Sequence, residues 1–339
     1  MAESHTIAIE GSDAAFGCAA DDTVLSAALR AGLGFPHECN SGSCGTCKFA
    51  AVQGAFVSDW PEAPGLSPRD LAKGNRHLAC RVRPLEAGRI KVRLDPLYVP
   101  AIRPDRRTVR FLGSRPLARD LAEFTFQDTG AATFHPGQYV LLRLPGVARD
   151  RAYSMSNLPN RGGRWELIVK RVAGGAASAA LFERARPGTA LAIDGPYGRA
   201  YLQLPATRPI VCVAGGSGLG PMIAILRGAL AAGAGRPEPI RLYYGGRDPA
   251  SLAPLHAFAD IAEAGDRICF RAAISDAPDA NAWAGARGLI HEVVEREAGP
   301  VLAEADIYVA GPPPMVRATV EMARRQGAEP SRILYDNFY

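Results

Sequence analysis

Lysine is scarce in this sequence: only four of its 39 basic residues are lysine, and the others are arginine. With 34 acidic residues, the formal net charge of the 339-residue chain is +5. The basic residues form no single stripe with aromatic side chains among them, which is the pattern of a nucleic-acid-binding surface. We therefore expect no nucleic-acid partner.

The sequence also lacks a continuous apolar segment that could cross a membrane. Its longest uncharged run, residues 209–226, contains two prolines and four glycines, which favours a strand, a loop and a helix start over a membrane span. No basic, apolar leader opens the chain. We expect a cytoplasmic protein with no membrane partner, and a monomer by default.

Length and composition indicate a multidomain globular protein. One domain usually takes about 100–200 residues, so 339 residues predict two or three. Charge is uneven along the chain, because residues 1–60 contain seven acids against Arg30 and Lys48, whereas residues 98–120 contain six arginines against two aspartates. The acidic segment suggests electrostatic docking of a partner.

Four of the seven cysteines follow the spacing C-x4-C-x2-C…C, at Cys39, Cys44, Cys47 and Cys80. This spacing is typical of plant-type [2Fe–2S] clusters, and the small residues between the first three can direct backbone N–H groups at sulfur. The alternatives are a zinc site, which more often contains two C-x2-C pairs, and four cysteines that bind no metal. The remaining cysteines, Cys18, Cys212 and Cys269, are predicted core residues.

Patterns around the cysteines predict a β-grasp domain over residues 1–97. Residues 6–10 and 89–94 alternate like strands, and residues 23–31 have helical spacing after a predicted cap at Asp21 and Asp22. Three prolines within residues 96–104 then predict a linker.

Residues 98–206 show short alternating runs between Gly and Pro turns, which predict an antiparallel β-barrel. Arg151, Tyr153 and Ser154 suit a flavin, because arginine binds phosphate, tyrosine stacks and serine hydrogen-bonds the ring. Gly175 and Ser178 precede an apolar helical stretch and are expected to hold a pyrophosphate. Lys170 is included with the cofactor-binding residues.

Residues 207–339 predict an α/β domain with a parallel sheet and a nicotinamide dinucleotide site. A strand at 210–214 leads into a helix through a loop whose predicted phosphate-binding residues are Gly215, Gly216, Ser217, Gly218, Gly220 and Pro221. Strands at 240–244 and 306–310 end at further glycines. Because ligands bind at the carboxyl ends of such strands, we expect Gly245, Gly311, Pro312 and Met315 to line the site.

These motifs, R-x-Y-S, G-x-x-S and G-G-x-G-x-x-P, resemble those of the ferredoxin-NADP reductase superfamily. With the N-terminal plant-type ferredoxin pattern, the chain is most similar to reductase components of multicomponent aromatic-ring oxygenases. Segments 35–45, 60–66 and 335–339 look most like toluene monooxygenase reductases.

The resemblance implies FAD, with Arg151, Tyr153 and Ser154 at the flavin and Gly175 and Ser178 at its pyrophosphate. Phe338 and Tyr339 would cover the ring, or would simply be a docked C-terminus. Ser154 and these two aromatic residues are the predicted catalytic residues. Many relatives have cysteine before Gly-Pro-Pro; this chain has Ala310.

The expected function is an electron-transfer reductase that passes electrons from NADH through FAD to a [2Fe–2S] cluster. We expect NADH rather than NADPH as the electron donor. The sequence allows either, because Asp248 suits the ribose 2′-hydroxyl of NADH and Arg247 suits the 2′-phosphate of NADPH. The expected acceptor is a diiron aromatic monooxygenase, reached directly or through a Rieske ferredoxin. Alternatives are the reductase of a Rieske dioxygenase, a redox sensor that does not turn over, and a zinc-binding interaction module.

Overall fold

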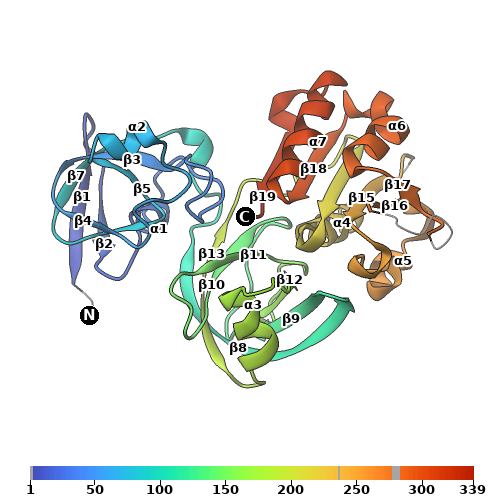
Figure 1. The fold of residues 1–339 in the computed structure, drawn as a ribbon, viewed down its shortest axis with the longest axis horizontal. Helices are drawn as coiled ribbons and strands as arrows, with labels where there is room; N and C mark the ends of the chain where they lie inside the picture. The colour runs from blue at the N-terminus through green and yellow to red at the C-terminus, as the bar shows by residue number, and fades with distance from the viewer. Residues whose placement is uncertain (1–2, 236, 277–282) are drawn as a thin grey trace. The chain divides into compact units, whose positions relative to one another are not determined.

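The computed structural model describes residues 3–235, 237–276 and 283–339 (Figure 1). Their contacts define two compact units. Unit 1 contains residues 1–106 and 194–197, and unit 2 contains residues 107–193 and 198–339. Each unit is described by itself.

Unit 1 is built on a five-stranded sheet, with the order β2-β1-β7-β3-β5, and a separate two-stranded sheet. The strands are β1 (Ser4–Ile9), β2 (Ala15–Ala19), β3 (Lys48–Gln53), β4 (Phe56–Ser58), β5 (Arg76–Leu78), β6 (Val82–Pro84) and β7 (Gly88–Lys91). The helices are α1 (Val24–Arg30), α2 (Pro68–Ala72) and the 3-10 turn η1 (Pro96–Tyr98). The predicted strands and helix around the cysteines are therefore present.

The N-cap of helix α1 lies one residue beyond the cap predicted at Asp21 and Asp22. The Thr23 hydroxyl accepts from the Ser26 amide at 3.1 Å, and so Thr23, not Asp21 or Asp22, is the N-cap. The Asp22 carboxylate instead accepts from the Thr23 amide. Six of the seven residues of α1 are buried, which makes the helix part of the core of unit 1.

The first half of unit 2 carries a six-stranded antiparallel sheet with the order β11-β10-β13-β8-β9-β12. An additional bridge between Met155 and Leu167 brings the two edge strands together, as closure of a barrel requires. The elements are β8 (Asp105–Ala118), β9 (Leu121–Gln127), β10 (Tyr139–Arg143), β11 (Arg151–Ser154), β12 (Arg164–Lys170), α3 (Ala176–Ala179), the π-helix η2 (Ala180–Arg184) and β13 (Ala190–Tyr197), whose last four residues count with unit 1.

The second half of unit 2 is a parallel sheet with the order β17-β16-β15-β14-β18-β19. Its strands are β14 (Ile210–Gly215), β15 (Ile240–Gly246), β16 (Ile268–Ile274), β17 (Ala286–Arg287), β18 (Asp306–Gly311) and β19 (Ile333–Asn337). Its helices are α4 (Leu219–Ala231), α5 (Ala259–Ala262), α6 (Ile290–Leu302) and α7 (Pro313–Arg325). Short 3-10 turns complete it: η3 (Gly216–Gly218), η4 (Pro249–Ser251), η5 (Leu255–Ala257), η6 (Gly265–Arg267) and η7 (Pro330–Arg332).

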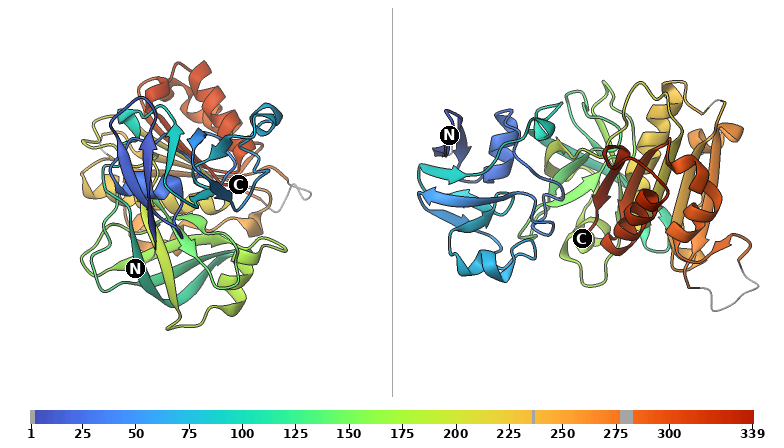
Figure 2. Two further views of the ribbon diagram at one scale, coloured as in Figure 1. Left: turned by 90° about the vertical axis from the view of Figure 1, so that its left-hand side faces the viewer. Right: turned by 90° about the horizontal axis from the view of Figure 1, so that it is seen from above.

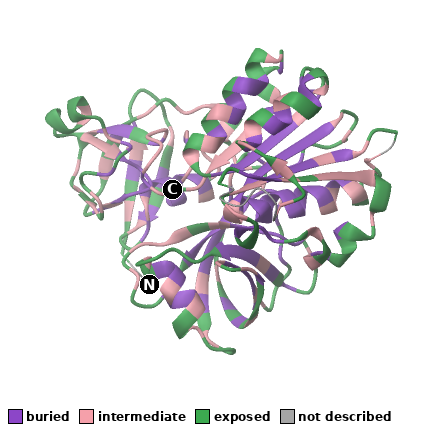
Figure 3. Cartoon of the chain, turned by 45° about the vertical axis from the view of Figure 1, so that its right-hand side comes forward, coloured by how far each residue is buried: buried purple, intermediate pink, exposed green. Residues whose placement is uncertain are grey.

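Helices cover both faces of this parallel sheet (Figure 2). Alternate residues of β14 enter two different cores: Cys212 packs with α4 and α5, whereas Val211 and Val213 pack with α6 and α7. Strand β14 is consequently buried along its whole length, whereas β16, β17 and β19 are covered only in part (Figure 3 colours the chain by burial). This explains why 210–214 reads as a continuous apolar run and not as an alternating one.

Two of the three cysteines outside the cluster pattern are core residues as predicted, since Cys18 and Cys212 are fully buried. Cys269 is only partly buried, so that prediction was wrong. It lies on β16, next to the two-residue edge strand β17, where cover is incomplete. Within the part of the chain that the structure describes, every helix is too short or too polar to cross a bilayer.

Candidate functional site

The cysteine loop of unit 1 connects α1 to β3 and is closed by glycine contacts. Gly42 and Gly45 have positive φ, and the Gly65 amide donates to the Gly42 carbonyl at 2.9 Å. A Cβ built on Gly45 would lie 2.6 Å from the Gly65 oxygen. Only glycine therefore lets residues 42–45 pack this closely against residue 65.

The four predicted cluster cysteines form two pairs. The Sγ atoms of Cys39 and Cys44 are 3.2 Å apart, and those of Cys47 and Cys80 are 3.4 Å apart. Two pairs suit two iron atoms with two thiolates each. Among the described residues, no group of three His, Cys, Asp or Glu side chains converges as on a single metal ion.

One thiol of each pair is favoured as the thiolate. The pKa of Cys39 falls to about 5, chiefly because its sulfur accepts a hydrogen bond from Cys44, with further bonds from Ser41 and the Cys44 amide. The pKa of Cys80 is lowered by the hydrogen bond from Cys47 and by the charge of Arg81. Thiolates are the form that ligates iron.

A buried amide with no partner lies beside this loop. Asn40 is 2% exposed and has a φ of 50°, and both polar atoms of its side chain lack hydrogen-bond partners in the described structure. A buried, unsatisfied polar group is costly unless something absent from the protein satisfies it. The paired thiols and this amide together fit a cluster at the loop.

The predicted flavin residues lie on edge strand β11, which pairs with β10. Burial raises the pKa of Tyr153 to about 12, so its hydroxyl stays protonated at neutral pH. Ser154 is 4% exposed, and its hydroxyl has no partner among the described residues. Arg151 donates to the carbonyl of Arg149 at 2.9 Å. An unsatisfied buried hydroxyl fits a ring atom of a bound flavin.

Ser178 closes the loop that carries Gly175. Its hydroxyl accepts from the Val172 amide at 3.1 Å and lies within 3.1 Å of the carbonyls of Val172 and Gly175. A Cβ on Gly175 would lie 2.9 Å from this hydroxyl. The structure thus directs the Ser178 hydroxyl to its own loop, and contact of this loop with a pyrophosphate stays a prediction.

The predicted nicotinamide residues meet at the carboxyl edge of the parallel sheet. Gly215 is in register with Gly245, and a Cβ on Gly215 would lie 2.6 Å from Met315 Sδ and 3.1 Å from Pro312 Cδ. A Cβ on Gly311 would lie 3.0 Å from the Gly215 carbonyl. These positions are glycine because Met315, Pro312 and the backbone of the facing strand approach them closely, at the sheet edge where ligands of parallel α/β sheets bind.

The glycine loop of the sheet also packs against the flavin strand region of the same unit. A Cβ on Gly220 would lie 3.4 Å from Ile168 Cβ and 3.6 Å from the Ser154 carbonyl. A Cβ on Gly216 would lie 3.5 Å from Lys170 Cδ. Lys170 itself pairs with Asp120 at 3.3 Å. The structure therefore brings the predicted flavin and nicotinamide residues side by side.

The C-terminal aromatic residues follow β19 at the same edge. The Phe338 amide donates to the Gly311 carbonyl at 2.9 Å, and its ring packs partly against the sheet core. Tyr339 is 63% exposed. Phe338 therefore lies next to Gly311, at the predicted nucleotide edge.

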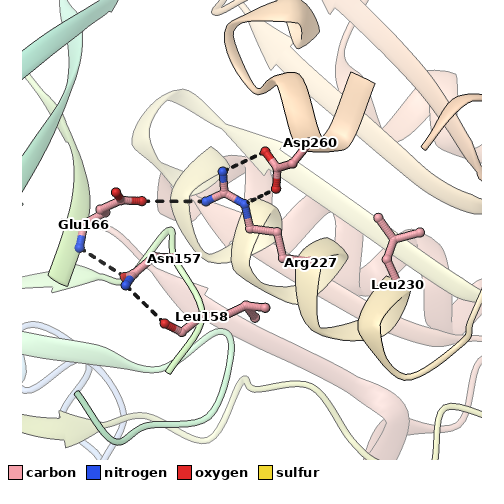
Figure 4. Close-up of a pocket in the computed structure, with 6 residues that line it drawn as sticks. All are labelled: Asn157, Leu158, Glu166, Arg227, Leu230 and Asp260. Carbon is pink, nitrogen blue, oxygen red and sulfur yellow. Dashed lines mark hydrogen bonds and ion pairs between the residues drawn. The ribbon is translucent and has the colours of Figure 1, made fainter. Parts of the chain in front are cut away.

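A pocket of about 420 Å³ lies elsewhere in unit 2 (Figure 4). Its lining consists of Asn157, Leu158, Glu166, Arg227, Leu230 and Asp260, none of which is a predicted site residue. Arg227 lines the pocket and forms ion pairs with Asp260 at 2.6 Å and with Glu166 at 3.9 Å. Since these charges are already paired, we regard the pocket as structural.

Sequence reasoning missed two residues of the site, Asn40 and Arg81. Each directly follows a predicted ligand, Cys39 and Cys80 respectively, and each is at least 95% buried. Adjacency to a ligand was the available signal. Their burial could not be predicted, because polar residues of these types are mostly exposed.

Three family models match the chain in sequence. A 2Fe-2S iron-sulfur cluster binding domain matches residues 7–85, an oxidoreductase FAD-binding domain matches 112–201, and an oxidoreductase NAD-binding domain matches 212–321. Each match falls within one of the three predicted domains, whose boundaries stay predictions. Together the models cover the cysteine loop, the flavin motif and the glycine loop.

Curated relatives extend over nearly the whole chain. The ferredoxin--NAD(P)(+) reductase CarAd of Metapseudomonas resinovorans is 40% identical, covering 95% of this chain and 96% of its own. The ferredoxin--NAD(+) reductase component of the alkene monooxygenase system of Xanthobacter autotrophicus is 44% identical, covering 95% and 97%. The xylene/toluene monooxygenase electron transfer component XylA of Pseudomonas putida is 30% identical, covering 98% and 93%.

A solved structure has the same fold from end to end. The ferredoxin reductase in carbazole 1,9a-dioxygenase superposes with a TM-score of 0.91 at 37% identity, covering 99% of both chains. The chain uses a [2Fe–2S] cluster, FAD and a nicotinamide dinucleotide, and it is an oxidoreductase. It belongs to the ferredoxin and oxygenase reductases, iron–sulfur flavoproteins that join a ferredoxin domain to FAD- and NAD-binding domains.

Proposed function

We propose that this reductase serves a diiron aromatic monooxygenase, to which it delivers electrons directly or through a Rieske ferredoxin. Support comes from relatives whose names place them in monooxygenase systems, among them the alkene and xylene/toluene systems. We also propose that it works in the cytoplasm as a monomer, with NADH as its donor.

A Rieske dioxygenase partner is the second candidate. It is favoured by the similarity to the ferredoxin reductase in carbazole 1,9a-dioxygenase. A reductase of either system would need the same three cofactors, so the partner alone separates the two proposals.

The proposed roles follow the positions of the residues. Cys39, Cys44, Cys47 and Cys80 would hold the cluster, and Arg151, Tyr153, Ser154, Lys170, Gly175 and Ser178 would hold FAD. The loop residues 215–221 with Gly245, Gly311, Pro312 and Met315 would bind the nucleotide. When bound, the flavin supplies the conversion of a two-electron hydride into single electrons.

The proposed roles at FAD and at the nucleotide are carried by one observation, the packing of Gly220 against the Ser154 carbonyl. The nucleotide loop and the flavin strand are thereby held next to each other. The protein's own contribution is binding and orientation, because the redox chemistry belongs to the cofactors. Ser154 would donate its hydroxyl to the flavin ring, and the Phe338 ring would limit access of water.

NADH rather than NADPH is proposed from the end of β15. The pKa of Asp248 is lowered by the hydrogen bond from Arg119, which keeps an ionised carboxylate two residues beyond Gly246. An acid at this position of an α/β sheet suits a ribose hydroxyl and disfavours a 2′-phosphate. Comparison of kcat/KM for NADH and NADPH tests this, and a preference for NADPH would refute it.

An anaerobic visible spectrum, recorded before and after stoichiometric NADH, tests the electron relay. We expect flavin bands over a [2Fe–2S] absorption, with both bleached by NADH, and about two irons and one FAD per chain. Purified diiron hydroxylase and Rieske ferredoxin, each offered alone, then separate the partners. Faster reduction of the Rieske ferredoxin of a dioxygenase would favour the second candidate.

A further inference from the structure

Arg81 is a buried cation beside the cluster loop. It directly follows Cys80, and its side chain is 5% exposed. Arginine is almost never buried without compensating partners, because transferring its charge out of water is costly. Its contacts therefore indicate what its charge is positioned to serve.

Two contacts hold the guanidinium in place. Nη2 donates to the backbone carbonyl of Asn40 at 3.2 Å, and Nη1 lies 3.6 Å from Asp59 Oδ2. The Asp59 amide also donates to the Arg81 carbonyl at 3.0 Å. Asn40 presents its carbonyl from a left-handed backbone with φ of 50°. Arg81 is thus tied to residues on both sides of the loop.

The aliphatic stem of Arg81 lies on the loop itself. A Cβ on Gly42 would lie 3.1 Å from both Cγ and Cδ of Arg81, and 3.3 Å from the Trp60 ring. Gly42 lies between Cys39 and Cys44, so Arg81 packs on the segment that joins one thiol pair and follows a member of the other. Arg81 therefore contacts the segment between the cysteines of one pair and directly follows a cysteine of the other.

One donor of Arg81 has no protein partner. Nε is buried and makes no hydrogen bond with the described residues. The potential of an iron–sulfur cluster depends on nearby charge, hydrogen bonds to sulfur and exposure.

We propose that Arg81 raises the reduction potential of the cluster, by placing a buried positive charge beside the thiolates that take up the added electron density. Asp59 partly offsets this charge. The proposal rests on the proposed cluster ligands, and it assigns Arg81 as a positioning and electrostatic residue that does not ligate iron.

Potentiometric titration of the holoprotein, with the cluster followed by its visible and EPR signals, tests the proposal. In Arg81→Gln we expect the cluster potential to fall by the equivalent of about a tenfold change in the one-electron equilibrium, about 59 mV. Arg81→Lys retains the charge and should keep most of the potential. Asp59→Asn removes the offsetting acid and should shift the potential upward.

Arg89→Gln is the matched control, since Arg89 is an exposed arginine of the same unit, 53% exposed and paired with Glu10. Its loss should leave the potential unchanged. An unchanged potential in Arg81→Gln, or shifts of the same sign in Arg81→Gln and Asp59→Asn, would overturn the proposal. Iron content and the EPR signal of the unmodified protein report separately on the cluster ligands. If Arg81→Gln does not bind a cluster, the potentials of Arg81→Lys and Asp59→Asn decide.

Discussion

At the scale of single residues, two of the buried polar side chains that lack partners among the described residues lie at proposed cofactor positions. Ser154 and Asn40 lie in different units, yet each has a buried side chain with unsatisfied hydrogen-bonding atoms. Such groups cost about 1–3 kcal/mol when they stay unsatisfied. A bound cofactor at each position would remove this cost, which is why these two residues deserve tests apart from the motifs around them.

Replacing Ser154 by alanine should slow reduction of the flavin by NADH. The loss of one hydrogen bond corresponds to about 1 kcal/mol, and hence to a rate reduction of about five- to tenfold. Anaerobic stopped-flow spectroscopy at the flavin band measures this rate.

Ser156→Ala is the matched control, because Ser156 is also fully buried but its hydroxyl donates to Glu123 at 3.0 Å. It should lower stability and leave the rate of flavin reduction unchanged. Equal rates in Ser154→Ala and the unmodified protein would remove Ser154 from the proposed catalytic residues.

The cysteines can be tested by the same comparison, between a proposed site residue and a buried residue outside the site. Cys80→Ser should abolish the [2Fe–2S] absorption and the bound iron while FAD is retained, because cluster ligation needs both thiol pairs. Cys212→Ala should keep iron, since Cys212 lies in the sheet core of unit 2. Iron analysis and the visible spectrum distinguish the two, and a full iron content in Cys80→Ser would contradict the proposed ligand set.

At the scale of elements, the nucleotide edge depends on how closely the loop after β14 approaches β18. A Cβ built on Gly218 would lie 2.0 Å from the Ala310 carbonyl, although the φ of Gly218, −58°, is ordinary for any residue. Gly218 is therefore required by contact and not by backbone conformation. This distinguishes it from Gly216, whose φ is 57°.

Gly218→Ala should consequently disturb the edge of the sheet. We expect a loss of at least about 1–3 kcal/mol in the free energy of unfolding, as in other overpacked sites, and a raised KM for NADH. Gly113→Ala is the control, because a Cβ there meets nothing within 4 Å. Chemical denaturation and steady-state kinetics measure both effects, and a Gly218→Ala protein equal to the control in both would contradict the contact.

Arg227 connects helix α4 to two other elements (Figure 4). It donates to the Ser156 carbonyl at 2.7 Å and to both carboxylate oxygens of Asp260 on α5. Arg227→Gln should lower the free energy of unfolding by about 1–3 kcal/mol, the usual range for charged hydrogen bonds. Thermal denaturation should show no such loss for Arg161→Gln, an exposed arginine; a loss as small as in this control would show that the ion pairs contribute little.

At the scale of the whole molecule, charge distribution predicts how a partner is found. Residues 1–60 carry a net charge of −5, although the chain as a whole is +5. Long-range attraction raises association rates by 10-fold to 1,000-fold and is screened within about 10 Å at 0.1 M salt. Turnover with the oxygenase partner should therefore fall as salt concentration rises.

The slope of turnover against salt concentration, measured in charge variants, identifies the docking surface. Neutralising the exposed acids Glu3 and Asp13 together should flatten it, whereas neutralising the exposed acids Glu263 and Glu304 of unit 2 should not. Partner-dependent oxygen consumption at several ionic strengths provides the measurement. A slope that responds equally to both double variants would argue against docking at the acidic segment.

Local patterns in the sequence predicted the [2Fe–2S] cluster, the nicotinamide dinucleotide and the strands beside the cysteines, whereas FAD was implied by the resemblance to a known family. A cysteine spacing, a glycine loop between a strand and a helix, and a continuous apolar run each depend on residues close together in the chain. The cap of α1 was predicted one residue early, because Asp22 and Thr23 are both good capping residues and the sequence does not say which one caps. The burial of Cys269 was predicted wrongly, because strand order in the sheet is not a local pattern.

Tertiary structure alone decided how distant segments meet. The pairing of Cys47 with Cys80, the contact of Gly220 with the Ser154 carbonyl, and the burial of Arg81 over Gly42 join residues that are far apart in sequence or that carry no visible signal. Such contacts arise from packing of whole elements, which sets burial and distance only after the chain has folded. The sequence therefore determined which cofactors this protein carries, and the fold determined which side chains lie at their proposed positions and that Arg81 is buried against the cysteine loop.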